Sequence, residues 1–330
     1  MKKLVNLVLC VGMALCMVSF AMAEETIQKP ANFPRKEIKV IVPYAPGGAF
    51  DLAVRNLQPI LKEKYDVNII VENVEGGSGA VGIMQCIASK ADGYTLALAG
   101  RNWVSNIANG VVDIQLDQID YLCGVTADTL ALVVAANSPY ETVDDFCQAA
   151  LKNPGTMTIG SPALNNGNHA CAVMLGKAYG NKDLFNTVPL SGSSRVMAEI
   201  IGGGLDGGSV KIADSVTQIK NGDVKVLMVF DKNRAVLAPD APTIEECGYA
   251  YWPYGGNEFN CNAIIAPVGL DSEIREYLVS VFAAAVKDEA FVTYCDNAGA
   301  VADPVIGQEL KAQIANLYET FLTWQDVVFN

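Results

Sequence analysis

The sequence predicts an α/β protein built as two lobes around a ligand cleft, and three observations lead to this prediction. Strand-like apolar runs alternate with helical runs, which is typical of a parallel sheet covered by helices. The chain has 330 residues, which is long for one hydrophobic core and typical of two units of about 150 residues. No low-complexity linker divides it, so we expect the chain to cross between the lobes more than once.

The first half of the chain contains four apolar runs that predict buried strands. These strands are expected at residues 37–42, 67–71, 95–99 and 130–135, and the intervening helices at 51–64, 81–89 and 142–152. Thr142 opens the last of these helices, and Asp145 follows three residues later, which approximates a capping box.

The second half of the chain continues the alternation. Strands are expected at residues 156–159, 206–210, 224–229 and 262–266, and helices at 169–179 and 194–201. From Asp271 to the C-terminus the pattern is helical.

The first 23 residues have the pattern of a secretory signal peptide. Two lysines precede an apolar segment at residues 4–20, and Ala21-Met22-Ala23 supplies a small-x-small cleavage site. An uncleaved membrane anchor is the alternative, but this segment is at the lower limit for spanning a bilayer. Cys16 follows a leucine rather than a small residue, which argues against a lipid anchor. We therefore expect a periplasmic protein that is exported unfolded by the general route.

Composition argues against several classes of partner and site. The formal charge is −13, becomes −15 without Lys2 and Lys3, and includes no basic cluster, so nucleic acid and anionic membranes are poor partners. Nine cysteines occur, two of them in the leader, and no Cys-x-x-Cys pair indicates a zinc or redox site. The other seven are expected to be mostly buried thiols, with one or two disulfides as the alternative. We expect a soluble monomer without a metal.

Three loops have the chemistry to bind an anion. Ligands of such sheets lie at the carboxyl ends of strands, where loops lead into helix N-termini with unpaired N–H groups. The loops cover residues 42–51, 159–169 and 188–194. Each alone is explained more simply as an ordinary turn, but three together favour a carboxylate or phosphate ligand. In the first loop we expect the N–H groups of residues 48–51 to face it.

The same loops carry a family resemblance. The motifs are Pro43-Tyr-Ala-Pro-Gly-Gly-Ala-Phe-Asp51, Asp92-Gly-Tyr-Thr-Leu96, Asn153-Pro-Gly155, Val188-Pro-Leu-Ser-Gly192, Gly204-Leu-Asp206 and Ala238-Pro-Asp-Ala-Pro-Thr243. With these motifs in this order, the chain resembles the Bug-type substrate-binding proteins of tripartite tricarboxylate transporters over essentially its whole length after the leader.

The resemblance implies a type II periplasmic-binding-protein fold, with two α/β lobes, a ligand cleft and a two-strand hinge. Lobe 1 is expected to comprise residues 24–129 and 252–330, and lobe 2 residues 130–251. The implied function is to bind a small carboxylate, such as a di- or tricarboxylate or an aromatic carboxylate, and to deliver it to the membrane components of the transporter. No cofactor is implied. A solute-binding protein linked to a sensor is an alternative.

The resemblance also implies ligand contacts from both lobes. In lobe 1 they are Tyr44, Ala45, Gly47, Gly48, Ala49, Phe50, Asp51, Ser78 and Gly79, and in lobe 2 Ser161, Ala163, Asn165, Asn166, Ser191 and Gly192. The chain departs from the family at Leu190-Ser191-Gly192, where Tyr-Lys-Gly is usual, and near Arg101, where small or hydroxylated residues are usual. The identity of the carboxylate is therefore not implied.

Arg101 and Lys211 are the candidate cations of the cleft. The negative net charge of the protein would repel an anion, but salt screens charges beyond about 8 Å. Whether an anion binds therefore depends on the charges close to the site. Arg101 directly follows an expected strand with Asn102 beside it, which suits recognition of a second anionic group. A surface arginine paired with a nearby acid is an equally good interpretation. Lys211, which follows the strand-like segment at 206–210, is a weaker candidate of the same kind.

The stretch from Gly76 to Gly82 matches the dinucleotide motif G-x-G-x-x-G after a strand and before a helix. A Rossmann site requires an acid about 20 residues later, and none occurs between Gly93 and Val112. Arg101 could instead meet the extra phosphate of NADP, so an exported NADP-dependent enzyme stays an alternative. We favour the carboxylate receptor, because export offers no route for a cofactor.

A hydrolytic α/β enzyme is the other alternative. His169 is the only histidine and would have to serve any nucleophile, but no G-x-S-x-G turn occurs. We expect His169 near the start of a helix as a structural or cleft-rim residue, with ligand contact as the second interpretation. Asp51 is expected as a charge at a helix start rather than a general base. Trp103 is expected in the core at the lobe interface, or else over a ligand ring. We therefore expect no catalysis.

Overall fold

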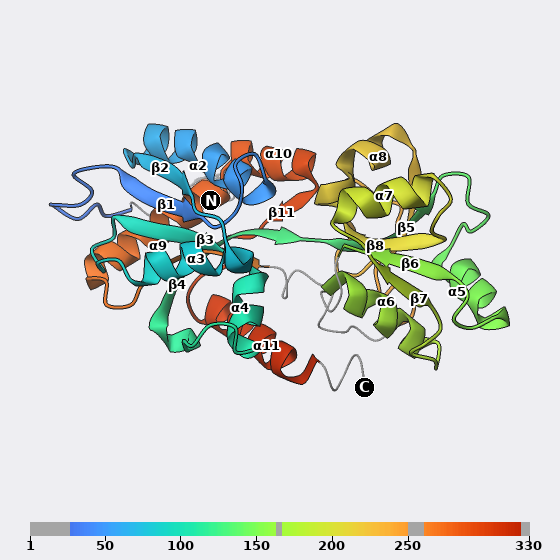
Figure 1. Cartoon of the computed structure of the whole chain (residues 1–330). Coiled ribbons are helices and arrows are strands. Elements are labelled where there is room, and N and C mark those ends of the chain that lie inside the picture. The colour runs from blue at the N-terminus through green and yellow to red at the C-terminus, as the bar shows by residue number, and fades with distance from the viewer. Residues whose placement is uncertain (1–26, 163–166, 250–260, 325–330) are drawn as a thin grey trace, which may run out of the picture.

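The computed structural model describes residues 27–162, 167–249 and 261–324. The described chain forms two α/β lobes, each around its own sheet, which lie side by side in Figure 1. The expected signal peptide lies outside the described residues, and so do Ala163, Asn165 and Asn166.

The first sheet has six strands, and its order differs from the chain order. Its spatial order is β11 (Ala300–Ala302), β4 (Ile119–Asp128), β10 (Cys261–Pro267), β3 (Thr95–Ala99), β1 (Ile38–Val42) and β2 (Ile69–Asn73). The last three strands are parallel, but β10 is antiparallel to both β3 and β4. The expected parallel strands are present as β1, β2 and β3, and the sheet as a whole is mixed because β10 enters it only after the chain has formed the second sheet.

The second sheet has five strands and is also mixed. Its spatial order is β7 (Asn186–Pro189), β6 (Thr158–Ser161), β8 (Gly207–Lys211), β5 (Leu130–Ala135) and β9 (Val224–Val229). The first three strands are parallel, and β5 runs antiparallel to both of its neighbours.

Helices cover both faces of each sheet. The first lobe contains α2 (Ala49–Tyr65), α3 (Ala80–Ile87), α4 (Arg101–Ala108), α9 (Ser272–Val286), α10 (Glu289–Ala298) and α11 (Gly307–Trp324). The second contains α5 (Val143–Lys152), α6 (Gly167–Ala178), α7 (Ser193–Ile201) and α8 (Val216–Asn221). Short 3₁₀ turns are η1 (Gly77–Gly79), η2 (Leu116–Gln118) and η3 (Ala213–Ser215). The capping box of α5 is confirmed, since Thr142 Oγ1 accepts from Asp145 N at 3.1 Å.

Alternating side chains of each strand divide every lobe into two cores. On β1, Ile38, Val40 and Val42 pack with α2 and α9, whereas Ile41 packs with α3, α4 and α11. Figure 1 shows α2 and α10 above this sheet and α4 and α11 below it.

Six cysteines are described as free thiols, five of them buried, as expected for apolar packing residues. None of the described helices is both long enough and apolar enough to pass through a membrane.

The chain passes from the first sheet to the second at Thr129, between β4 and β5. The crossing is held by Thr129 Oγ1, which donates to Asp231 Oδ2 at 3.2 Å, and by Ile212 N, which donates to the Thr129 carbonyl at 3.0 Å. Burial raises the pKa of the Asp231 carboxyl, and the backbone N–H of Asn233 counteracts it. These contacts anchor the crossing to the second lobe.

Candidate ligand cleft

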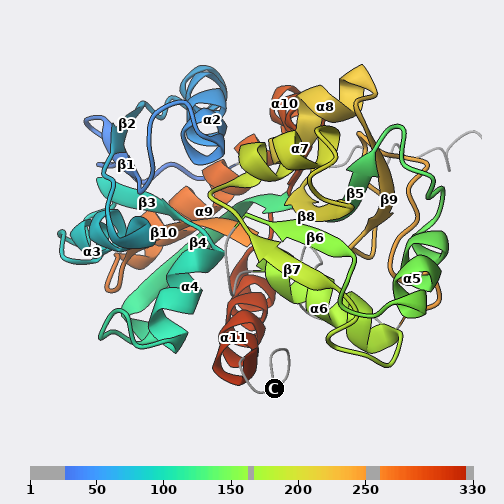
Figure 2. The same cartoon turned by 45° about the vertical axis from the view of Figure 1, so that its right-hand side comes forward.

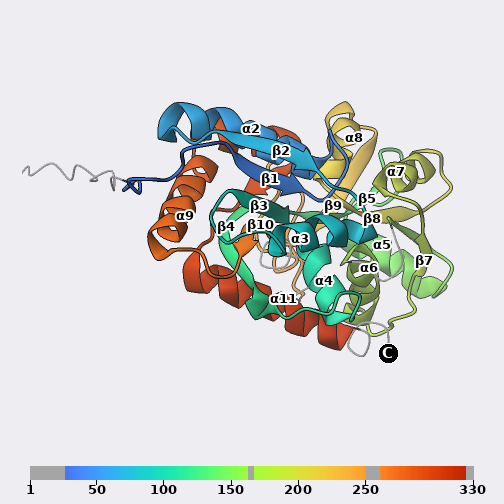
Figure 3. The same ribbon diagram turned by 60° about the vertical axis from the view of Figure 1, so that its left-hand side comes forward.

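Both lobes direct the carboxyl ends of parallel strands, and the helices that follow them, towards the lobe boundary. In the first lobe β1, β2 and β3 lead into α2, η1 and α4, and in the second β6, β7 and β8 lead into α6, α7 and η3. Figure 2 shows α4 and α6 on opposite lobes, and in Figure 3 the two helices lie next to each other, as the contact of Arg101 with Gly167 requires. The expected ligand loops therefore meet at one boundary.

Asp51 shapes the first loop rather than serving as a base. It is the third residue of α2, its side chain is 2% exposed, and its carboxylate accepts from Gly47 N at 2.9 Å and Asn73 Nδ2 at 3.1 Å. The hydrogen bond from Arg55 and those from Gly47 and Asn73 lower the pKa of Asp51, although burial opposes them. Gly47 has a φ of 79°, which explains a glycine at this turn.

The amides of the first loop divide into two groups. The N–H of Gly48 faces the Ala45 carbonyl at 3.4 Å, so the expectation that it points to a ligand is wrong. Helix geometry supplies no carbonyl for the N–H groups of Ala49, Phe50 and Asp51, which form the first turn of α2. These three amides are the donors that the loop offers.

Tyr44 joins the first loop to the glycine loop and to α4. Its ring packs edge-on against Phe50 at 4.6 Å, and a β-carbon on Gly79 would lie 3.1 Å from its hydroxyl oxygen. Burial raises the pKa of Tyr44, and a hydrogen bond with the Asn102 side chain counteracts this. Tyr44 thus brings together the first loop, the glycine loop and the start of α4, which are far apart in the sequence. Ser78 lies in the 3₁₀ turn η1 of the glycine loop.

Arg101 extends from the first lobe to the second. It begins α4 after the N-cap Gly100, and a β-carbon on Gly167, the first residue of α6, would lie 2.4 Å from its Nη1. Burial lowers the pKa of Arg101, and Asp128, Cys171, Tyr44 and Asp214 oppose this shift in that order. The arginine therefore lies between the lobes, near carboxylates of both.

Lys211 is paired within the protein. Its Nζ lies 2.6 Å from Asp128 Oδ2, in a pair that is largely shielded from solvent at the crossing strand. Asp214 accepts a hydrogen bond from Ser193 Oγ at 2.7 Å. Sequence reasoning missed Asp128, Asp214 and Gly167, although each lies beside a strand or helix end.

The loops of the second lobe are tied to each other. Leu190 N donates to the Ser161 carbonyl at 2.8 Å, and Gly192 N donates to the Pro162 carbonyl at 3.0 Å. Gly192, with a φ of 94°, is the N-cap of α7, and Ser191 before it is exposed. Pro162 leads towards the expected contacts Ala163, Asn165 and Asn166, which the structure does not describe.

His169 and Trp103 both lie in the interior. His169 is the third residue of α6 and is 8% exposed, and burial lowers its pKa, which favours the neutral imidazole. It starts a helix as expected. Trp103 is buried with residues of α4 and α11 in the first lobe. Trp103 therefore belongs to the core of the first lobe rather than to the lobe interface.

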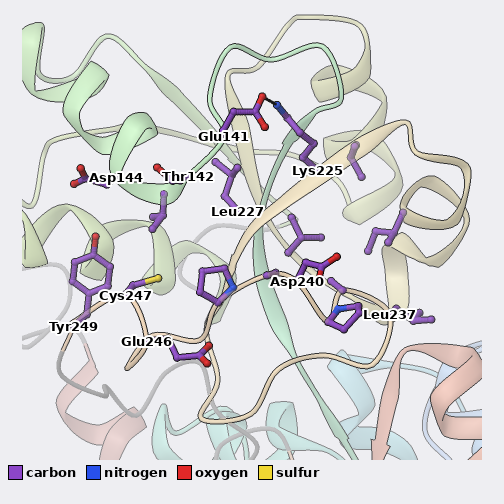
Figure 4. A pocket seen from close by; sticks show the side chains of 18 residues that line it. Glu141, Thr142, Asp144, Lys225, Leu227, Leu237, Asp240, Glu246, Cys247 and Tyr249 are labelled. Carbon is purple, nitrogen blue, oxygen red and sulfur yellow. Dashed lines mark hydrogen bonds and ion pairs between the residues drawn. The ribbon is translucent and has the colours of Figure 1, made fainter.

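A cavity of about 340 Å³ lies at the lobe boundary and is lined by Gly47, Ala49 and Phe50 together with Asp128 and Asp214. A separate cavity of about 750 Å³ lies in the second lobe, beside the ion pair of Glu141 with Lys225 (Figure 4). It is lined by none of the expected ligand residues. The boundary cavity borders the start of α2, and Arg101 is not among its lining residues, so the candidate site comprises the start of α2 together with Arg101. The described residues contain no cluster of His, Cys, Asp and Glu side chains that could hold a metal.

Comparisons with known proteins agree with this architecture. The model of the tripartite tricarboxylate transporter family receptor, TctC, matches residues 53–318. The chain is similar to protein BugT of Bordetella pertussis, with 25% identity over 274 residues, which are 79% of this chain and 80% of BugT.

Solved structures show the same fold. A TctC solute-binding protein from Polaromonas superposes with a TM-score of 0.76 at 23% identity, over 89% of this chain and 99% of that one. MatC from Rhodopseudomonas palustris, solved with bound malate, superposes with a TM-score of 0.66 at 21% identity, over 90% and 100%. The two-lobed periplasmic-binding fold and the expectation of a receptor rather than an enzyme are confirmed. The chain belongs to the family of tripartite tricarboxylate transporter receptors.

Proposed function

We propose that this protein is a periplasmic receptor that captures a small dicarboxylate between its lobes and delivers it to the membrane components of a tripartite tricarboxylate transporter. The observation that carries the proposal is Arg101, whose guanidinium lies at the boundary between a lobe-1 helix and the start of α6. Delivery follows from the family. The mature receptor is a monomer whose signal peptide ends at Ala23.

The first carboxylate binds at the start of α2. The N–H groups of Ala49, Phe50 and Asp51 offer donors there, and a helix N-terminus stabilises a negative charge. Ala49 and Phe50 line the boundary cavity, whose volume of about 340 Å³ is at the small end of the range for ligand pockets. Arg101 is not among the residues that line this cavity, so the cavity volume does not set the length of the ligand.

The second carboxylate binds Arg101. A guanidinium donates two parallel hydrogen bonds to a carboxylate, which an ammonium cannot do in the same geometry. Lys211 is less suited to the ligand because it is paired with Asp128. Two similar proteins support a dicarboxylate: MatC was solved with malate, and another Rhodopseudomonas palustris protein with adipate.

The lobes that close on the ligand comprise residues 24–129 with 252–330, and residues 130–251. The crossing at Thr129 supports the first boundary, since β4 and β5 belong to different sheets. Closing would bring Ser161, Ser191 and Gly192 of the second lobe against a ligand held by the first.

Thermal-shift screening of the purified protein tests this function. Malate, succinate or adipate should raise the melting temperature, and calorimetry should give one site per chain. The ligand should be recovered chemically unchanged, and NADPH should produce no shift. Turnover of the ligand, or stabilisation by NADPH alone, would contradict the proposal.

A further inference from the structure

The side chain of Arg101 lies directly on the α-carbon of Gly167. A β-carbon built on Gly167 would lie 2.4 Å from Nη1, 3.1 Å from Cζ and 3.3 Å from Nη2 of Arg101. Three guanidinium atoms therefore occupy the space that any side chain at this position would need. The contact joins α4 of one lobe to α6 of the other.

The base of Arg101 is fixed by contacts within the first lobe. Its N-cap, Gly100, has no room for a side chain, because a β-carbon there would lie 2.5 Å from Phe50 Cζ and 2.9 Å from Asn262 Oδ1. The next residue, Asn102, is hydrogen-bonded to Tyr44. The backbone of Arg101 thus moves with the loop that offers amides to the ligand.

Nearby carboxylates of both lobes attract the guanidinium. Asp128 and Asp214 both interact favourably with Arg101, and each is already held, by Lys211 at 2.6 Å and by Ser193 at 2.7 Å. Attraction by two carboxylates leaves a long, flexible side chain several rotamers. The close contact with Gly167 selects among them.

We propose that Gly167 is a positioning residue of the ligand cleft: because it has no side chain, it sets the place where the guanidinium of Arg101 meets the second anionic group of the ligand. This inference rests on the proposed function. It also explains how the α2 loop is coupled to the second lobe, through Phe50, Gly100, Arg101 and Gly167 in direct contact.

Gly167→Ala is a specific perturbation of this contact. Gly167 does not have the left-handed backbone that excludes alanine, and alanine is readily accepted in the first turn of a helix. The clash falls on the far end of a flexible side chain rather than on backbone. We therefore expect the variant to fold normally and to displace only the guanidinium.

The experiment is a double-mutant cycle on Gly167→Ala and Arg101→Ala, read by malate calorimetry. Gly167→Ala should weaken malate roughly tenfold, about the value of one charge-assisted hydrogen bond. In the Arg101→Ala background the same change should have no effect on affinity, and the melting temperature should stay the same or rise. Equal losses in both backgrounds, or no loss in the wild-type background, would overturn the proposal.

A second measurement does not depend on the ligand. The Nε–H resonance of Arg101, assigned by its disappearance in Arg101→Ala, should shift in Gly167→Ala while other arginine signals stay in place. If wild-type protein binds no malate, the proposed function fails for that ligand, and this resonance still decides the role of Gly167. An unchanged resonance would show that Gly167 does not position the arginine.

Discussion

Replacing Arg101 with alanine is the most direct test of the dicarboxylate site. The side chain is partly buried between the lobes, so its hydrogen bonds to a ligand would be shielded from water. A charge-assisted hydrogen bond contributes about 1.5–3 kcal/mol, and about 1.4 kcal/mol corresponds to a factor of ten in affinity. Arg101→Ala should therefore weaken a dicarboxylate roughly 10- to 150-fold.

The fold should survive this change. Asp128 keeps its ion pair with Lys211, and Asp214 keeps its hydrogen bond from Ser193, so neither carboxylate is left without a partner. Arg195→Ala is the matched control, because it removes the same charge from an exposed pair with Glu199 on α7. Surface pairs contribute about 0–1 kcal/mol, and we expect this control to bind like the wild type.

Calorimetry with malate and with a monocarboxylate of similar shape separates the interpretations. The dicarboxylate should lose much more affinity than the monocarboxylate, and Arg101→Lys should give an intermediate loss because it keeps the charge without the paired donors. Small and equal losses for both ligands would show that Arg101 is a surface residue. Large and equal losses would show that it holds the shared carboxylate or the lobe itself.

Three further predictions concern the cleft and the crossing. Gly48→Val should abolish carboxylate binding, because a side chain at the N-cap of α2 would fill space that the carboxylate needs beside the amides of Ala49 to Asp51. The variant should still fold, since Gly48 has an extended backbone that valine can adopt, whereas Gly47→Val should also destabilise the fold because φ there is 79°. Full affinity in folded Gly48→Val would place the ligand elsewhere. His169 is buried with a lowered pKa, so its contribution to stability is present above the unfolded pKa of about 6.5 and is lost as the pH falls below it. His169→Gln should reduce that loss when the free energy of unfolding is measured by denaturation from about pH 5 to 8. An unchanged dependence of this free energy on pH would refute the assignment. Lys211→Met should lower the free energy of unfolding by about 1–3 kcal/mol, because it removes the lysine that pairs with Asp128 at the crossing. Urea titration measures this change. A loss below about 0.5 kcal/mol, which is within the range of surface substitutions, would contradict the prediction.

Most strands could be predicted from the sequence because they are short, apolar and bounded by turns. The expected strands at 95–99, 130–135 and 224–229 agree with β3, β5 and β9 to the residue. The helix α4 was missed because it follows β3 after a single glycine and carries polar residues such as Arg101 and Asn102 among its apolar ones. Strand β4 was missed because it is ten residues long and is separated from β5 by Thr129 alone, so no turn signal marks its end.

The site was predictable only where one loop determines its own shape. The turn at Gly47 and the helix start at Asp51 follow from local sequence, and the structure has both. The contact of Arg101 with Gly167 joins residues 66 positions apart in different lobes, so no local pattern contains it. The pair of Lys211 with Asp128 also joins residues that are far apart in the sequence, so no local pattern contains it. This pair engages Lys211, which the sequence suggested as a ligand cation, at the crossing between the lobes.

The charges of the proposed site allow an acidic protein to select the dianion that we propose as its ligand. Arg101 and Lys211 are nearly balanced by Asp128 and Asp214 at the lobe boundary, so an approaching anion meets little net field there. A monoanion can be held by the amides of α2 alone, and it gains nothing from the guanidinium. A dianion reaches Arg101 only if the arginine lies within hydrogen-bond distance of the second carboxylate, in competition with the two aspartates. Because partly buried charges are weakly screened, salt should change this preference little. The selectivity therefore depends on the position of one guanidinium, not on the net charge of −13.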